Sequence, residues 1–188
     1  MDPQRYRSLN FASLRDENLP TLYSWLQRPH VREFYHKKPV PAGDRFHAEY
    51  LQRLAPDWPT KCFVTHVGLT PIGYIQAYKV AHYPGYAATI QETTGISLDL
   101  FIGETEFVGQ GWGRLILLKF MHEVAFPLFS GEHMCWIYHE TSNHRALGAS
   151  RAAGFKHARN FTEEGDQKQL MSVTNSEVAA LVERLLNG

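Results

Sequence analysis

The sequence lacks an excess of charge of either sign, because its 188 residues contain 19 Lys and Arg and 19 Asp and Glu. A balanced chain gives no electrostatic basis for wholesale binding to nucleic acid or to anionic membranes. It has no apolar run near the roughly 20 residues of a membrane helix. Its first ten residues, MDPQRYRSLN, lack the apolar core of a signal peptide. We therefore expect a cytoplasmic protein with no nucleic-acid and no membrane partner.

Cysteine is scarce too, and metal-binding spacings are missing. The two cysteines, Cys62 and Cys135, lie in apolar strand-like runs, which favours buried free thiols over a disulfide framework. Histidine is common, with 10 residues, but no HExxH, CxxC or compact His/Asp cluster occurs. We expect no metal site.

What remains is the composition of an ordinary globular protein, 44% hydrophobic, 20% charged and 13% aromatic. The length suffices for one domain with a substantial core. No internal repeat and no linker-like segment occurs, so we expect a single domain over residues 1–188.

Hydrophobic periodicity and turn residues predict the order of the elements. Strands are predicted at 6–14, 61–68, 71–80, 96–103 and 133–140, with two more within 155–173. Helices are predicted at 15–29, 44–55, 111–126 (ended by Pro127) and 142–154, with a last one after residue 174. Residues 31–43 are predicted to be a connection and residues 81–95 an irregular loop. This order predicts an α/β fold with a mixed, mostly antiparallel central sheet and helices on both faces.

Three glycines at alternate positions lead into an apolar helix in FVGQGWGRLILLKFM, residues 107–121. Glycine tolerates positive φ and close ligand approach, and the first turn of a helix offers unpaired N–H groups and partial positive charge. The stretch has neither the GK[ST] of a Walker loop nor the GxGxxG spacing of a dinucleotide site. Taken alone, the pattern favours a phosphate site and a plain tight turn about equally.

One acid, Asp99, lies among large apolar residues in ISLDLFIG, residues 96–103. The period of two places Ser97, Asp99 and Phe101 on one face of this strand. A carboxylate is not left unpaired in a core. Asp99 therefore either caps a turn or pairs with an arginine, or it faces a cleft.

A second motif, SNHRALGASRAAGF, follows a strand that ends in YHE. Together with the glycine turn it resembles the GNAT acyl-CoA N-acyltransferases. In that family the turn and its helix hold the coenzyme A pyrophosphate, and N-x-x-A-x-x-x-Y-x-x-x-G-F completes the cleft. Asn143, Ala146, Gly154 and Phe155 stand at those spacings. The resemblance implies a GNAT-like fold, acetyl-CoA as co-substrate and these cofactor-binding residues: Phe101, Ile102, Val108, Gly109, Gln110, Gly111, Gly113, Arg114 and Asn143.

Two positions depart from the family pattern. Val108 stands where the family usually has Gln or Arg, although the backbone amides from Gly109 to Arg114 could still hold phosphates. Ser150 stands where much of the family has a Tyr that protonates the leaving thiolate. Tyr138 or water is then left to supply that proton, and Ser150 itself is either plain helix surface or a catalytic hydroxyl.

Three further stretches are similar to the aminoglycoside 6'-N-acetyltransferase branch: LPTLYSWLQRPHVREFY, PIGYIQAY, and GISLD before GQGWG. That branch has LYEWL, PIGYAQSY, and GID before GKGLG in the same order. Its key Asp matches Asp99, which the resemblance makes the catalytic residue. A carboxylate can hold an ammonium and accept its proton, so that the neutral amine attacks the thioester.

The segment between Lys79 and Arg114 has no Lys or Arg but has four acids, Glu92, Asp99, Glu104 and Glu106. It is either a rim that attracts a cationic substrate or a solvated acidic loop. Aromatic faces stack on sugar rings and attract ammonium groups. We therefore predict a substrate site made of Tyr35, Tyr83, Tyr86, Glu92 and Asp99.

The leading hypothesis is an acetyl-CoA-dependent N-acetyltransferase that transfers directly to an amine of a small cationic acceptor, such as an aminoglycoside, with antibiotic resistance as the implied role. Siderophore hydroxylamine acyltransferases share much of the N-terminal pattern, so hydroxylamine acylation stays open. A non-catalytic acyl-CoA-binding GNAT module stays open because of Val108 and Ser150. The expected assembly is a monomer or a homodimer.

Overall fold

The fold is taken from a computed structural model of the chain, which describes residues 2–35, 39–41 and 43–187. Seven strands form one sheet in the order β1-β2-β3-β4-β5-β7-β6. The strands are β1 (Leu9–Ser13), β2 (Lys61–Val67), β3 (Thr70–Lys79), β4 (Ile96–Ile102), β5 (Met134–Glu140), β6 (Lys156–Glu163) and β7 (Asp166–Thr174).

Five of the neighbouring strand pairs are antiparallel, and the pair β4–β5 is parallel. This parallel pair is short, because it joins Ile96 to Cys135 and Ser97 to Trp136 and then ends. Beyond these residues β4 and β5 diverge. The mixed, mostly antiparallel sheet predicted from the sequence is confirmed.

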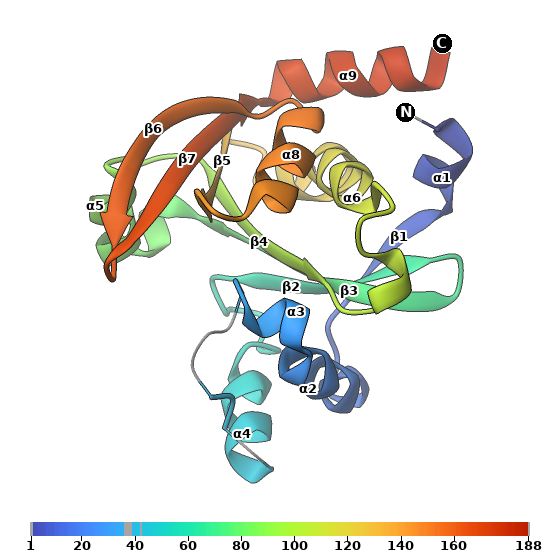
Figure 1. Ribbon diagram of the computed structural model, residues 1–188, viewed down its shortest axis with the longest axis vertical. Helices are drawn as coiled ribbons and strands as arrows, with labels where there is room; N and C mark the ends of the chain where they lie inside the picture. Colours follow the sequence, from blue (N-terminus) through green and yellow to red (C-terminus); the bar gives the residue numbers. More distant parts are fainter. Residues whose placement is uncertain (1, 36–38, 42, 188) are drawn as a thin grey trace.

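Helices cover both faces of this sheet, as predicted (Figure 1). The helical segments are α1 (Pro3–Ser8), η1 (Asp16–Asn18), α2 (Leu19–Gln27), α3 (Pro29–Arg32), α4 (Asp44–Gln52), η2 (Val80–His82), α5 (Pro84–Ile90), η3 (Thr105–Phe107), α6 (Trp112–Phe120), η4 (Met121–Ala125), α7 (Phe126–Leu128), α8 (His144–Ala152) and α9 (Asn175–Asn187). In Figure 1, α6, α8 and α9 lie above the sheet and α2, α3 and α4 lie below it.

The alternation along β4 separates two hydrophobic cores. Leu98 packs in the core that contains α6 and α9, whereas Phe101 packs in the core that contains α2 and α4. Cys135 belongs to the first core and Cys62 to the second. Both cysteines are free and buried, which confirms the prediction.

The predicted strand at 6–14 is wrong in its first half. Residues Pro3–Ser8 form α1, and β1 begins at Leu9. The Asp2 carboxylate accepts a hydrogen bond from the Gln4 amide at 2.8 Å, and Pro3 occupies the first helical position. Both features start helices, and they outweigh a short apolar alternation.

The predicted irregular loop at 81–95 contains a helix, α5. Pro84 begins it, where a missing N–H costs nothing, and Gln91 ends it in the left-handed conformation with φ of 53°. The proline and glycine in this stretch mark a helix start rather than a loop.

The predicted helix at 111–126 extends further than expected. After α6 the chain widens into a π-helical turn, η4, and continues into α7 through Pro127 to Leu128. A wide turn alters the hydrogen-bond pattern just before the proline. The predicted connection at 31–43 begins inside α3, and its residues 36–38 and 42 lie outside the described residues.

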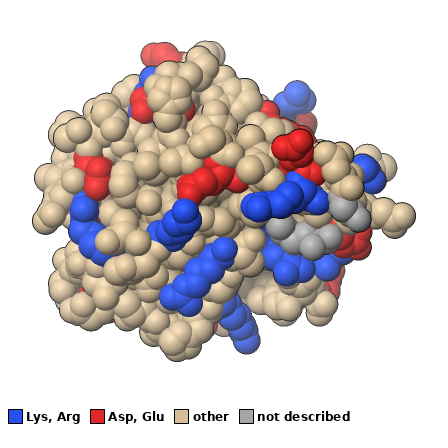
Figure 2. Space-filling view, turned by 90° about the horizontal axis from the view of Figure 1, so that it is seen from above, with Lys and Arg blue, Asp and Glu red and all other residues tan. Residues whose placement is uncertain are grey.

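Charged side chains of both signs share the face seen from the side of α9 (Figure 2). Lys and Arg atoms lie beside Asp and Glu atoms there rather than in one field of a single sign. Among the described residues, the helices are too short or too polar to cross a membrane.

Candidate active site

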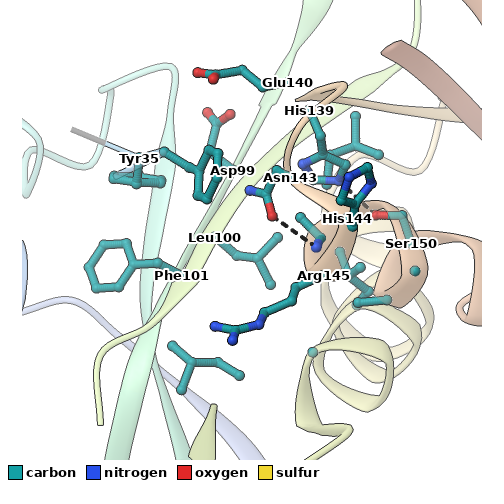
Figure 3. A pocket seen from close by; sticks show the side chains of 18 of the residues that line it. Tyr35, Asp99, Leu100, Phe101, His139, Glu140, Asn143, His144, Arg145 and Ser150 are labelled. Carbon is teal, nitrogen blue, oxygen red and sulfur yellow. Dashed lines mark hydrogen bonds between the residues drawn. The ribbon is translucent and has the colours of Figure 1, made fainter. Parts of the chain in front are cut away.

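The divergence of β4 and β5 opens a cavity of about 780 Å³ in the middle of the sheet. Its walls come from both strands, from the turn before α6, from one side of α8 along its length and from α3. Figure 3 shows the carboxylates of Asp99 and Glu140 on one side of it and His139 and Ser150 on the side of α8. One cavity thus joins the glycine turn to the lone acid.

The glycine turn forms one end of this cavity. Gly109 and Gly111 have φ of 76° and 78°, which only glycine adopts without strain. They line the cavity with Val108, Gly113 and Arg114. Backbone N–H groups in such a turn, followed by a helix N-terminus, form a concave site for an anion. The local geometry fits a phosphate cradle.

Three residues of the predicted cradle have distinct surroundings. The Nε atom of Arg114 is buried and has no hydrogen-bond partner among the described residues. A Cβ atom placed on Gly113 would lie 3.3 Å from the Ala149 Cβ, so this glycine also lets α6 approach α8 closely. Gln110 does not line the cavity, and its carbonyl accepts a hydrogen bond from Arg5 at 2.8 Å.

Asn143 joins the cavity at the start of α8. Its side-chain oxygen accepts a hydrogen bond from the Ala146 amide at 3.1 Å, which is an N-cap contact of α8 (Figure 3). In Figure 3, Arg145 extends from the same turn toward β4, past Leu100. The N-cap and cavity positions of Asn143 are therefore compatible.

The backbone of β4 forms the opposite wall. The Gly103 amide donates a hydrogen bond to the Ile72 carbonyl on β3 at 2.8 Å. In an antiparallel pair the backbone groups of alternate residues point to the same side, so those of Phe101 and Asp99 also point toward β3. The amides of Leu100 and Ile102 therefore point toward the opening beside β5. The His30 ring hydrogen-bonds the Ile102 carbonyl at 3.0 Å. The side chain of Phe101, on the other face, contacts the ring of Tyr35 at 4.7 Å between centroids.

Asp99 projects into the cavity from the middle of β4 (Figure 3). The Gln76 amide donates to its Oδ2 at 2.8 Å, and the Tyr74 hydroxyl donates to the Gln76 side-chain oxygen at 2.7 Å. Burial raises the pKa of Asp99, and hydrogen bonds from Gln76 and Tyr78 offset this rise only in part. Asp99 is thus a half-buried carboxyl with a raised pKa, suited to accept a proton.

The structure brings only part of the predicted substrate site to this cavity. Tyr35 and Asp99 line it, whereas Tyr83, Tyr86 and Glu92 do not. The hydroxyls of Tyr83 and Tyr86 hydrogen-bond Thr60 and Ser97, and both rings pack on Tyr78. Glu92 pairs with Arg159 at 3.2 Å. Helix α5, which the sequence did not reveal, holds this segment away from the cavity, and substrate contact at these three residues stays a prediction.

The acidic rim is also partly neutralised. Glu104 accepts hydrogen bonds from Arg28 and from the Trp25 indole, both at 2.7 Å. Burial alone would raise the pKa of Glu104, but these two partners lower it below its ordinary value. Glu104 therefore fastens α2 and the start of α3 to the end of β4. Its carboxylate is engaged by these partners rather than held ready for a ligand.

The position of the missing tyrosine holds a serine that is hydrogen-bonded to a histidine. Ser150 is fully buried, and its Oγ lies 2.8 Å from the Nε2 atom of His139, with which it shares a hydrogen bond. Burial lowers the pKa of His139 to about 4, so the ring is neutral near pH 7. Ser150 is therefore not helix surface. The spacing gave no signal for His139, because the pair joins β5 to α8 across a turn.

Tyr138 is occupied elsewhere. Its hydroxyl donates to a carboxylate oxygen of Glu163 at 2.9 Å, and burial together with that carboxylate raises its pKa. Among the described residues no group of three or more His, Cys, Asp or Glu side chains is arranged to hold a metal ion.

A known protein family and several solved structures are similar to this chain. The family model described as an acetyltransferase (GNAT) domain matches residues 15–163. No curated protein sequence matches the chain. The aminoglycoside acetyltransferase AAC(6')-Ib in complex with paromomycin and acetyl-CoA is similar in structure, with a TM-score of 0.73 and 19% identity over 92% of this chain and 96% of that one.

Two further solved structures share the fold. An aminoglycoside N(6')-acetyltransferase from Legionella pneumophila has a TM-score of 0.68 and 17% identity over 93% of this chain and 96% of its own. Spermidine N-acetyltransferase from Vibrio cholerae, in complex with CoA and spermine, has a TM-score of 0.74 and 13% identity over 92% of this chain and 99% of its own. At these identities the likeness shows the fold.

Proposed function

This chain belongs to the GNAT acetyltransferase family, and on that basis we propose that it transfers an acetyl group from acetyl-CoA to an amine of a small cationic acceptor, with aminoglycosides as the first candidates. The observation that carries the proposal is the position of Asp99, a half-buried acid with a raised pKa that shares one cavity with the glycine turn. The family supplies the reaction type, and the acid supplies the preference for a cationic amine.

The donor is held at the glycine turn. Backbone amides between Gly109 and Arg114, at the turn and at the N-terminus of α6, bind the pyrophosphate, and the unpartnered Arg114 Nε adds a charged donor. The pantetheine arm then runs between β4 and β5, where the outward-pointing amides of Leu100 and Ile102 are in reach.

The acceptor amine is mostly protonated near pH 7 and has no lone pair to attack. Asp99 holds the ammonium by charge and then accepts its proton. Its raised pKa makes the carboxylate a stronger base than an ordinary aspartate. The neutral nitrogen forms its bond to the thioester carbonyl carbon, and the developing oxyanion is stabilised by an amide of β4.

Collapse of the tetrahedral intermediate breaks the carbon–sulfur bond and expels the thiolate. The nitrogen gives up its second proton at this stage, and that proton goes to the sulfur. Ser150 donates a hydrogen bond to the departing sulfur when the neutral His139 donates its Nε2–H to the serine oxygen. The pair thus stabilises the thiolate, while a serine hydroxyl is too weak an acid to protonate it.

Assays of thiol release with acetyl-CoA test the proposal against four acceptors: kanamycin, spermine, a neutral amino sugar blocked at nitrogen, and a hydroxylamine. We expect turnover with the polycationic amines and none with the blocked sugar. Preferred acylation of the hydroxylamine would favour the siderophore reaction instead. Coenzyme A binding without turnover on any acceptor would favour a non-catalytic module.

A further inference from the structure

Helix α1 packs against the outer side of the glycine turn. Figure 1 shows the start of α6 between α1 and α8, so the turn has the cavity on one side and α1 on the other. The short helix is held at its start by the Asp2 cap and at its centre by Tyr6, which is buried against Lys119 of α6. The side of the turn that faces away from the cavity is therefore supported by a fixed element.

Arg5 makes two contacts with the turn from this helix. Its Nη2 atom donates to the Gln110 carbonyl at 2.8 Å, and its guanidinium carbon lies 4.1 Å from the centre of the Trp112 ring. Planar stacking and a forked set of donors are properties of arginine that lysine does not share. Arg5 thus holds the residues on either side of Gly111.

The first contact fixes the orientation of one peptide group. No cis peptide bond occurs among the described residues, so the Gln110 carbonyl and the Gly111 N–H point in opposite directions. Because Arg5 holds the carbonyl from the side of α1, the Gly111 N–H points away from α1. Gly111 lines the cavity, and because a glycine adopts positive and negative φ with similar ease, this peptide group could rotate if nothing held it.

We propose that Arg5 is a positioning residue for the donor site: by holding the Gln110 carbonyl and the Trp112 ring, it keeps the Gly111 amide turned toward the pyrophosphate of acetyl-CoA. This role rests on the proposed function. Arg5 also places a positive charge behind the turn. No proton or bond changes at Arg5, so its effect falls on donor binding and not on the chemical step.

The experiment compares two donors that carry the same thioester. Acetyl-CoA has the pyrophosphate, and S-acetylpantetheine lacks it. For Arg5→Ala we expect kcat/KM with acetyl-CoA to fall about 5- to 20-fold, mostly through KM, as for loss of one charged hydrogen bond. With S-acetylpantetheine we expect kcat/KM to stay within about twofold of wild type, because that donor makes no contact with the turn.

Two variants serve as references. Arg7→Ala removes an exposed arginine from the same helix, and we expect wild-type kinetics with both donors. Arg5→Lys keeps the charge but loses the fork, and we expect a loss between those of wild type and Arg5→Ala. Equal losses with both donors in Arg5→Ala would mean a merely structural role and overturn the proposal.

Calorimetry with coenzyme A separates this inference from the function on which it rests. Wild-type protein that binds coenzyme A while Arg5→Ala binds it equally well would overturn the role of Arg5 alone. Wild-type protein that does not bind coenzyme A would overturn the proposed function and this role with it. Tighter binding by wild type than by Arg5→Ala supports the proposal.

Discussion

The donor end and the acceptor end of the cavity are built in different ways. The donor end is one continuous stretch, a strand followed by a glycine turn and a helix, with α8 packed beside it. The acceptor end is assembled from α3, β3, β4, β5 and β7, which are distant in sequence. The difference shows that a local motif can identify a candidate binding element, whereas the surroundings of the proposed catalytic acid depend on how strands pair.

Asp99→Asn is expected to have the largest effect, and it acts at the acceptor end alone. We expect kcat/KM for the amine to fall about 10²- to 10⁴-fold, because the amide cannot accept the proton. Coenzyme A affinity should stay unchanged in calorimetry. Glu106→Gln, the same change at an exposed acid seven positions along the chain, should leave turnover at the wild-type level.

The pH dependence of kcat/KM is a second test of the role of Asp99 as a base. Asp99 works as a base only when it is ionised, and its pKa is raised by burial. The wild-type kcat/KM should therefore rise with pH through an apparent pKa above about 3.9, the ordinary value for aspartate. Full turnover by Asp99→Asn would refute its role as base and as ammonium anchor.

Ser150→Ala is expected to have the next largest effect. Ser150 lines the cavity on the side of α8. Loss of one hydrogen bond to the departing thiolate should lower kcat about tenfold and leave KM for both substrates near wild type. The control is Ser142→Ala, an exposed serine just before α8. Unchanged kcat in Ser150→Ala, with a lowered melting temperature, would mean that the His139 pair only supports the fold.

Glu104→Gln should reduce stability rather than turnover. We expect the free energy of unfolding to fall by about 1–2 kcal/mol, because the substitution weakens the contacts with Arg28 and Trp25. The pKa of Glu104 is lower in the folded than in the unfolded protein. Its contribution to stability is therefore complete above the unfolded-state pKa and is lost as the pH falls through the folded-state pKa. Urea unfolding at pH 7 and at pH 3 measures both effects. An equal difference between wild type and variant at the two pH values would contradict this linkage.

Glu92→Gln is expected to have the smallest effect. Its ion pair with Arg159 is partly exposed, and such pairs contribute about 0–1 kcal/mol. If the cavity lining defines the acceptor end, KM for the amine should stay within about twofold of wild type. A large rise in KM would restore Glu92 to the substrate site that the acidic segment suggested.

These differences also define what the sequence could predict. The period of two along β4 correctly placed Asp99 and Phe101 opposite Leu98, because burial on each face follows directly from the pleat. The glycine turn and the helix that follows β5 were predicted because each is local. The family resemblance added that these two segments share one cleft.

The rest depended on long-range packing. Gln76 reaches Asp99 only because β3 and β4 pair in a register that no short pattern specifies. His139 meets Ser150 across a turn, and the motif that contains Ser150 gives no indication of His139. Helix α1 was missed because the short alternation over residues 6–14 favoured a strand. Helix α5 was missed because the composition of residues 81–95 suggested a loop, although Pro84 begins a helix. Tyr86 lies on α5 and does not line the cavity, and its contact with substrate stays a prediction.

Calorimetric titration of coenzyme A into wild type, Asp99→Asn and Gly111→Val tests directly whether the two ends are separate. A branched side chain at the positive φ of Gly111 distorts the turn, so we predict at least tenfold weaker binding in Gly111→Val. Asp99→Asn should bind coenzyme A like wild type. Normal binding by Gly111→Val, or loss of binding in Asp99→Asn, would contradict a donor site built from the glycine turn and independent of the acid.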